Sequence, residues 1–162
     1  MKIYSKVFLV LAIASVFCGC YESRVPMASS KHSHIEPNLI GKWKKIVTAD
    51  DAASADMLVL NFNDKEYYVK YQDEKDITRY RAYIVTVKGV PFINAQFIER
   101  DERPFVFFRY SLSKDGVLTL RIISGDFVKT KFRSSRELYK FIKKHLQIEE
   151  LYGEPVRFKR ES

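Results

Sequence analysis

The spacing of apolar and polar residues changes twice along the chain. An apolar run from Val7 to Val16 comes first, and a serine-rich stretch without apolar periodicity follows it as far as Pro37. Beyond Pro37, short segments of alternating or wholly apolar residues are separated by polar turn residues, a pattern that predicts antiparallel strands. The expected strands span residues 39–48, 57–62, 66–72, 79–88, 92–99, 105–112, 117–124 and 156–160.

Short turns join most of these strands into consecutive hairpins. Asn63 to Lys65, Gly89 and the pair Asp115-Gly116 mark three of the turns, and an Asp-Gly pair favours the positive φ that tight hairpins require. Hairpins that follow one another need no crossover connection. We therefore expect a mainly β fold, an antiparallel up-and-down β-barrel or strongly curved sheet of seven or eight strands, with a two-sheet sandwich as the alternative.

After residue 133 the apolar positions recur every three or four residues. Ser134 and Glu137 have the spacing of a capping box, in which the serine side chain accepts the backbone N–H of the glutamate. The apolar positions that follow share one face of a helix: Leu138, Phe141, Ile142 and Leu146. We expect one amphipathic helix before the last strand.

Several of the expected strands are apolar on both faces. In the strand 105–112, Phe105 and Phe107 share one face, and Val106 and Phe108 share the other. We expect one face to fill the interior of the barrel and the other to meet the apolar face of the helix or a partner.

The first nineteen residues have the features of a bacterial export signal. Lys2 and Lys6 give a positive start, and the apolar run is roughly half of the 20 residues that a membrane-spanning helix needs. The run ends in Phe17-Cys18-Gly19-Cys20, which holds both cysteines of the chain and resembles the lipobox of bacterial lipoproteins, where a cysteine after a small residue is acylated. The resemblance implies that residues 1–19 are a signal peptide that is removed and that Cys20 carries acyl chains such as palmitate.

The lipobox resemblance also implies a location. Tyr21 stands where an aspartate would favour retention in the inner membrane, so we expect an anchor in the outer membrane, facing the periplasm. We interpret residues 20–37, with two prolines and four serines, as a flexible tether, and residues 38–162 as the folded domain. Three alternatives stay open: a disulfide between the two cysteines, a chance pair in an ordinary signal peptide, and an uncleaved signal anchor.

Gly41-Lys42-Trp43, in the first expected strand, is similar to the Gly-x-Trp signature of lipocalins and related calycin barrels. In that family the tryptophan closes one end of an eight-stranded barrel, and an arginine from late in the chain lies across its ring. The resemblance implies structural roles for Gly41, Trp43 and either Arg157 or Arg160. Lipocalins place their helix after the eighth strand, so small bacterial lipoproteins with a lipocalin-like domain are the closer class.

A barrel of this kind suggests a binding site for a lipid-like ligand. The residues that we expect to contact the ligand combine aromatic rings with two cations on neighbouring strands: Tyr83, Phe92, Phe107, Arg109 and Arg121. Such a pocket takes an apolar or amphipathic molecule, with the arginines on a carboxylate or phosphate. The alternative is a barrel that its own side chains fill.

Composition and motifs limit the chemistry of the chain. The net charge of +8 becomes +6 if Lys2 and Lys6 leave with the leader, and an exported chain whose cations are interspersed with acids fits a nucleic-acid partner poorly. The sequence has no Gly-x-Ser-x-Gly elbow, and Lys31 to His34 offers too few ligands for a fixed metal site. We expect no enzymatic activity, cofactor or metal.

The expected function is that of a non-catalytic binding or scaffold module, held at the membrane by acyl chains, for a lipid-like ligand or an envelope protein. The alternative is a lipoprotein with a solid core that binds or inhibits a periplasmic protein through its loops at residues 49–56 and 72–78. An interior void lined by Phe and Tyr favours the first function, and a filled barrel with an exposed apolar patch favours the second.

Overall fold

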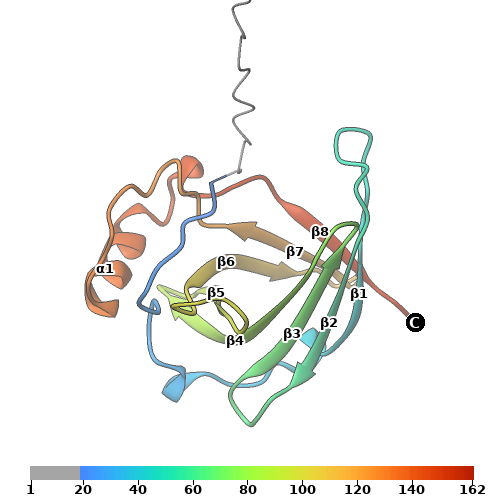
Figure 1. The fold of residues 1–162 in the computed structure, drawn as a ribbon, viewed down its shortest axis with the longest axis horizontal. Helices are drawn as coiled ribbons and strands as arrows, with labels where there is room; N and C mark the ends of the chain where they lie inside the picture. The colour runs from blue at the N-terminus through green and yellow to red at the C-terminus, as the bar shows by residue number, and fades with distance from the viewer. Residues whose placement is uncertain (1–18) are drawn as a thin grey trace, which may run out of the picture.

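The computed structural model describes residues 19–162 and shows a closed antiparallel β-barrel (Figure 1). Its eight strands are β1 (Gly41–Lys45), β2 (Ala55–Asn61), β3 (Tyr67–Asp73), β4 (Ile77–Val87), β5 (Val90–Phe97), β6 (Phe105–Leu112), β7 (Val117–Ile122) and β8 (Val156–Arg160). They pair in chain order, and β8 closes the barrel on β1. The expected barrel is confirmed and the sandwich is excluded. The expectations for the leader and Cys18 fall outside the described residues.

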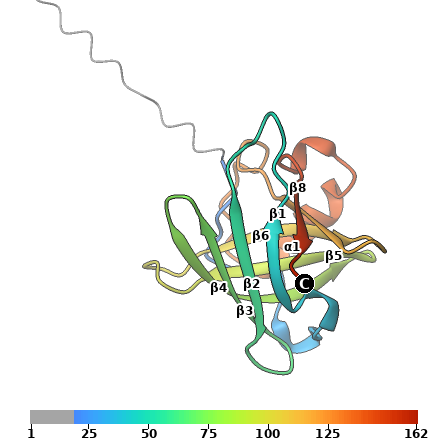
Figure 2. The ribbon, with the colours of Figure 1, turned by 90° about the vertical axis from the view of Figure 1, so that its right-hand side faces the viewer.

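Antiparallel pairing places the connections alternately at the two ends of the barrel (Figure 2). One end holds the β2–β3, β4–β5 and β6–β7 turns together with the start of β1, and we call it the closed end. The opposite end, the mouth, holds the β1–β2, β3–β4 and β5–β6 loops and the long β7–β8 connection, residues 123–155. Within residues 19–162, no helix combines the length and hydrophobicity that crossing a bilayer requires.

Trp43 fills the closed end, as the Gly-x-Trp resemblance implies. Its indole N–H donates to the carbonyl of Leu39 at 2.9 Å, in the short 3₁₀ helix η2 (Pro37–Leu39) that crosses this end. The guanidinium of Arg160 lies over the indole ring, 4.8 Å from its centroid, and donates to the carbonyl of Ile40 at 2.7 Å. The late arginine is therefore Arg160.

Arg157 does not have the structural role considered for it. Its side chain is exposed on the outer face of β8, where its register partner is Thr119. Gly41 does have such a role, because its φ is +140° and a Cβ there would approach the Arg160 guanidinium to 3.2 Å. A side chain at Gly41 would strain the backbone and displace the arginine from the indole.

Residues 20–37 do not form the expected free tether. They lie along the outer wall of the barrel from the mouth to the closed end, include the short 3₁₀ helix η1 (Ser30–His32), and form what we call the N-terminal strap (Figure 1). Tyr21 and Met27 are buried, and the Met27 N–H donates to the side chain of Asn94 at 2.9 Å. The serine- and proline-rich composition concealed these two apolar anchors, which remove enough surface from water to order the segment.

The predicted helix is α1 (Ser135–His145), and the Ser134 side chain accepts the Glu137 N–H at 3.3 Å, as expected. Its buried residues Leu138 and Ile142 face the barrel. A third 3₁₀ helix, η3 (Glu149–Leu151), follows it in the β7–β8 connection.

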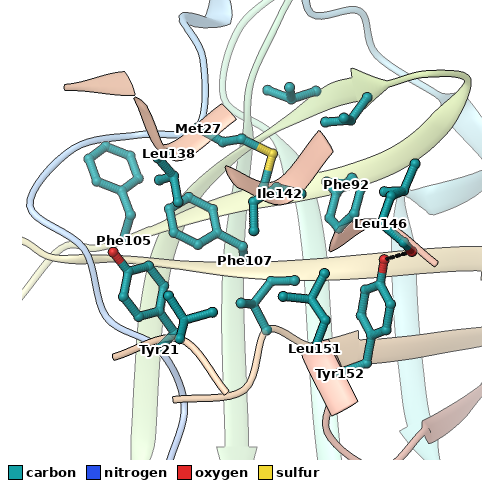
Figure 3. Packing of buried hydrophobic residues seen from close by; sticks show 14 of the residues in the cluster. Tyr21, Met27, Phe92, Phe105, Phe107, Leu138, Ile142, Leu146, Leu151 and Tyr152 are labelled. Atoms are coloured by element: carbon teal, nitrogen blue, oxygen red, sulfur yellow. Dashed lines mark hydrogen bonds between the residues drawn. The ribbon is translucent and has the colours of Figure 1, made fainter. Parts of the chain in front are cut away.

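The apolar residues form two cores, one on each side of the sheet. The outer core lies between the outer face of β4, β5 and β6 and a layer made of the strap and α1 (Figure 3). The inner core lies within the barrel and contains Trp43, Ala82, Ala95 and Phe158, among others. The two-faced apolar strands are therefore covered on both sides, as expected.

Candidate ligand-binding cavity

The barrel interior contains a cavity of about 290 Å³. Its walls are aliphatic and aromatic, and Glu154 is the one charged residue among the described residues that line it. The lining consists of Leu39, Met57, Val59, Tyr67, Val69, Tyr71, Tyr80, Ala82, Ile93, Ala95, Phe108, Leu118, Leu120, Ile122, Glu154, Val156 and Phe158. Such a surface binds an apolar chain by removing it from water, at about 0.8 kcal/mol per buried CH₂ group.

Small side chains at the middle of the barrel create part of this space. Ala82 of β4 and Ala95 of β5 are direct cross-strand partners, and both point inward. Their next neighbours on the inner face are Tyr67 of β3 and Val106 of β6. Side chains directly opposite each other on neighbouring strands are about 5 Å apart and normally fill the space above the sheet together. Two adjacent methyl groups, flanked by larger side chains, leave part of that space empty.

The floor of the cavity, at the closed end, has its polar atoms satisfied. The Tyr67 hydroxyl accepts the backbone N–H of Glu36 at 2.7 Å, and the Tyr110 hydroxyl donates to the Glu36 carboxylate at 2.7 Å. Leu39, just beyond them, is buried and lines the cavity. The floor therefore presents carbon to the interior and offers no competing hydrogen bond to an apolar chain.

Two tyrosines lie nearer the mouth. Tyr71 on β3 and Tyr80 on β4 both line the cavity, and the Tyr80 ring lies 4.8 Å from that of Phe97. Burial raises the pKa of Tyr71 and raises the pKa of Tyr80 to about 12. Both phenols are therefore neutral at physiological pH, and they add hydrogen-bonding capacity without charge.

The aromatic residues that we predicted as ligand contacts are elsewhere, so that prediction is wrong. Tyr83, Phe92 and Phe107 all belong to the outer core. Figure 3 shows Phe92 and Phe107 among the residues of the strap and α1 that cover them. Alternation shows that two neighbouring residues occupy opposite faces, but it does not show which face is interior, and both faces of these strands carry aromatic residues.

The two predicted arginines are brought together, but outside the barrel. Arg109 and Arg121 are direct cross-strand partners, and their guanidinium carbons lie 5.4 and 5.2 Å from the centre of the Tyr152 ring. They line an outer surface hollow of about 580 Å³. Arg121 is also bonded to Glu149 at 2.6 Å, so its charge has a partner. The prediction that these arginines hold the head group of an interior ligand is wrong.

The sequence does carry a signal for the cavity that the prediction missed. Trp43 points inward, so every second residue of β1 also does. The cross-strand pairs from β1 to β5 then place Ala82 and Ala95 on the same inner face. Alanines at mid-strand among large residues then mark the place where the interior is underfilled. To use this signal, one must know which residues pair across four successive hairpins, and the sequence predicts these pairs only approximately.

Among residues 19–162, no three or more His, Cys, Asp and Glu side chains gather closely enough to hold a metal ion. Comparisons with protein-family models, with curated proteins and with solved structures find no match to this chain.

Proposed function

We propose that this protein is a non-catalytic binding module for a lipid-like molecule, whose apolar chain occupies the barrel interior. The observation that carries the proposal is the cavity of about 290 Å³ with an almost wholly apolar wall. Its size is at the lower limit of ligand pockets, which suits one chain rather than two.

The test is binding of a single-chain probe such as decanol to the full chain, measured by calorimetry. Ala95→Leu places three more carbon atoms in the cavity, so we expect it to weaken decanol binding at least about tenfold. Ser111→Leu is the matched control, because Ser111 is exposed on the outer face of β6. Absence of decanol binding, or equal binding by both variants, would contradict the proposal.

We further propose that acyl chains on Cys20 anchor the protein in the bacterial outer membrane, facing the periplasm. Cys20 is exposed, and its backbone pairs with Ser124 at the start of the β7–β8 connection. The first part of that connection, residues 126–145, holds two acids, Asp126 and Glu137, and seven exposed cations: Lys129, Lys131, Arg133, Arg136, Lys140, Lys143 and Lys144. Acyl chains beside a basic surface make a stable membrane attachment.

Because the strap is packed on the barrel, an anchor at Cys20 would hold the domain close to the membrane. Cys20→Ser is expected to move the protein from the membrane fraction to the soluble or unprocessed fraction and to remove the acyl mass from the N-terminus. Cys18→Ser is the control and is expected to leave both unchanged. Unmodified Cys20 in protein taken from its own cells would contradict the anchor and leave the cavity proposal intact.

A second candidate function is docking of an envelope protein at the mouth. Three loops there expose large aliphatic side chains: Ile46, Val47, Ile77 and Ile98. Photo-crosslinking amino acids that replace Val47 and Ile77 in living cells distinguish the two proposed functions by the molecules that they capture. Lipid adducts support the cavity proposal, and a single protein adduct at both positions supports the second candidate.

A further inference from the structure

One cation of the barrel is directed inward, at the mouth. Lys45 is the last residue of β1, two residues beyond Trp43 and on the same face of the strand. Its register partner on β8 is Phe158, which lines the cavity. The Lys45 side chain is only 10 % exposed.

A buried ammonium group requires an anionic partner, because desolvation of an unpaired charge is strongly unfavourable. Asp51 of the β1–β2 loop supplies it, with its Oδ2 2.6 Å from the Lys45 Nζ. The aspartate side chain is 54 % exposed, so it reaches the lysine from the solvent side. The loop makes a local turn here, in which the Thr48 N–H donates to the Asp51 carbonyl at 3.0 Å.

We propose that Lys45 selects the head group of the bound molecule: the ligand is a single-chain amphiphile with an anionic oxygen head, a carboxylate or a phosphate, that takes the place of Asp51 on the Lys45 ammonium. This inference rests on the proposed function, since the apolar chain occupies the cavity below Lys45. The exchange keeps the buried ammonium paired throughout. Loss of the ion pair also has a small free-energy cost for Asp51, because its side chain is already half exposed to solvent.

The direction of the chain follows from the two ends of the cavity. The floor at Leu39 is apolar, and the hydroxyls of Tyr67 and Tyr110 beside it are already hydrogen-bonded to Glu36. The Lys45 ammonium group lies at the opposite end, the mouth, where Asp51 pairs with it from the solvent side. An amphiphile therefore enters with its chain first and leaves its head beside Lys45. Glu154, also at the cavity wall, disfavours a second negative charge and so favours a head with one anionic group.

The test compares three probes of equal chain length on the full chain by calorimetry: decanoate, decanol and decyltrimethylammonium. We expect the wild-type protein to bind decanoate about tenfold more tightly than decanol, the gain typical of a hydrogen bond to a charged group. Lys45→Gln removes this preference and leaves decanol affinity within about twofold. Asp51→Asn removes the competing carboxylate and tightens decanoate binding several-fold without changing decanol binding.

Lys44→Gln is the matched control, because Lys44 is the neighbour of Lys45 on β1 and is exposed on the outer face. It is expected to change neither affinity. Since Asp51 is half exposed, Asp51→Asn keeps the test valid if Lys45→Gln fails to fold.

Four results overturn the inference. Equal binding of decanoate and decanol, or equal weakening of both by Lys45→Gln, would make the ion pair purely structural. Tighter binding of the cation would assign the head group to Glu154 and Asp51 instead. These three results leave the cavity proposal standing, whereas failure of all three probes to bind overturns the cavity proposal and this inference together. If decanoate is preferred, a decyl phosphodiester, which carries one negative charge on a chain of equal length, then distinguishes a phosphate head from a carboxylate head.

Discussion

The two faces of strands β4, β5 and β6 are both apolar, yet one is fully packed and the other is not. On the outer face, Phe92 and Phe107 have no exposed surface and meet Met27, Leu138 and Ile142 from the covering layer. On the inner face the same strands border a cavity of about 290 Å³. The comparison teaches that aromatic residues alone do not separate a packed core from a site, because both faces carry them, and that the alanines at mid-strand on the inner face mark the site.

The cause of the difference is geometric. The covering layer on the outside is made of a helix and an irregular strap, which approach the sheet as closely as their side chains allow. The inner walls are held apart by the closure of the eight-stranded barrel, so short side chains such as Ala82 and Ala95 cannot be compensated by a closer approach of the opposite wall. A closed barrel therefore preserves a void that a two-layer structure would collapse.

The largest expected effect compares Phe107 with its neighbour Phe108. Phe107→Ala removes a fully buried ring from the packed outer core and is expected to lower the free energy of unfolding by about 3–5 kcal/mol. Phe108→Ala removes a ring that already borders the cavity, so its loss is expected to be smaller by about 1–2 kcal/mol. Urea unfolding of both variants measures the difference, and equal losses would show that the inner face is packed as tightly as the outer one.

This pair of residues also shows how much the sequence could predict. The strand and helix pattern was sufficient for a mainly β fold of seven or eight antiparallel strands, the capped helix and the apolar layer under it, because periodicity, turn residues and the capping box are local signals. The cavity was not predicted, since its existence depends on which residues of each strand point inward. Trp43 identifies the inward face of β1, but carrying that face to Phe107 and Phe108 requires the pairing register of every hairpin between them.

The N-terminal strap shows a different limit. Its composition is typical of a linker, yet Tyr21 and Met27 are buried in the outer core, and the partly buried Val25 and Ala28 pack against that core. Arg160 was identified as one of two alternatives, because the Gly-x-Trp resemblance implied a late arginine but not its register. Lys45 was not singled out as a site residue, although its spacing of two residues from Trp43 places both side chains on the same face of the strand.

A second pair of substitutions adds side-chain volume, one to the outer face of the sheet and one to the inner face. Val87 is fully buried in the outer core, so Val87→Phe is expected to destabilise the protein by about 1–3 kcal/mol through overpacking. Ala95→Leu extends into the existing cavity and is expected to change the free energy of unfolding by less than about 0.5 kcal/mol, or to stabilise the protein. Thermal unfolding of the two variants is the measurement. A loss above 1 kcal/mol for Ala95→Leu would mean that the cavity lacks room for three carbon atoms.

The comparison extends to the two ends of the barrel, since the closed end is filled and the mouth is not. Arg160→Ala removes the guanidinium over Trp43 and its bond to the Ile40 carbonyl, and is expected to cost about 1–2 kcal/mol. Arg157→Ala, three residues earlier on the same strand, is expected to cost less than about 0.5 kcal/mol because that side chain is exposed. Urea unfolding distinguishes them, and the fluorescence of Trp43, the one tryptophan of the chain, should shift only in the Arg160 variant.

The smallest effect concerns Glu66, which follows the β2–β3 turn at the closed end and is buried there. Its carboxylate accepts hydrogen bonds from Arg81 Nε at 2.6 Å and from Asn63 Nδ2 at 2.9 Å. Burial alone would raise the pKa of Glu66, but these donors outweigh it and hold the pKa below its ordinary value of 4.5. The unfolded chain therefore binds a proton more readily than the folded chain does as the pH falls.

The sign of the pH dependence follows from that order. The stabilisation by ionised Glu66 is complete well above pH 4.5 and is lost as the pH falls from there through the lower pKa of the folded state. Because Arg81 is half exposed, we expect Glu66→Gln to cost only about 1 kcal/mol at pH 7. Urea unfolding of wild type and variant between pH 7 and pH 3 should show this difference shrinking below pH 4.5. A difference that stays constant over that range would mean that packing of the Glu66 side chain, rather than its charge, secures the closed end against the strap.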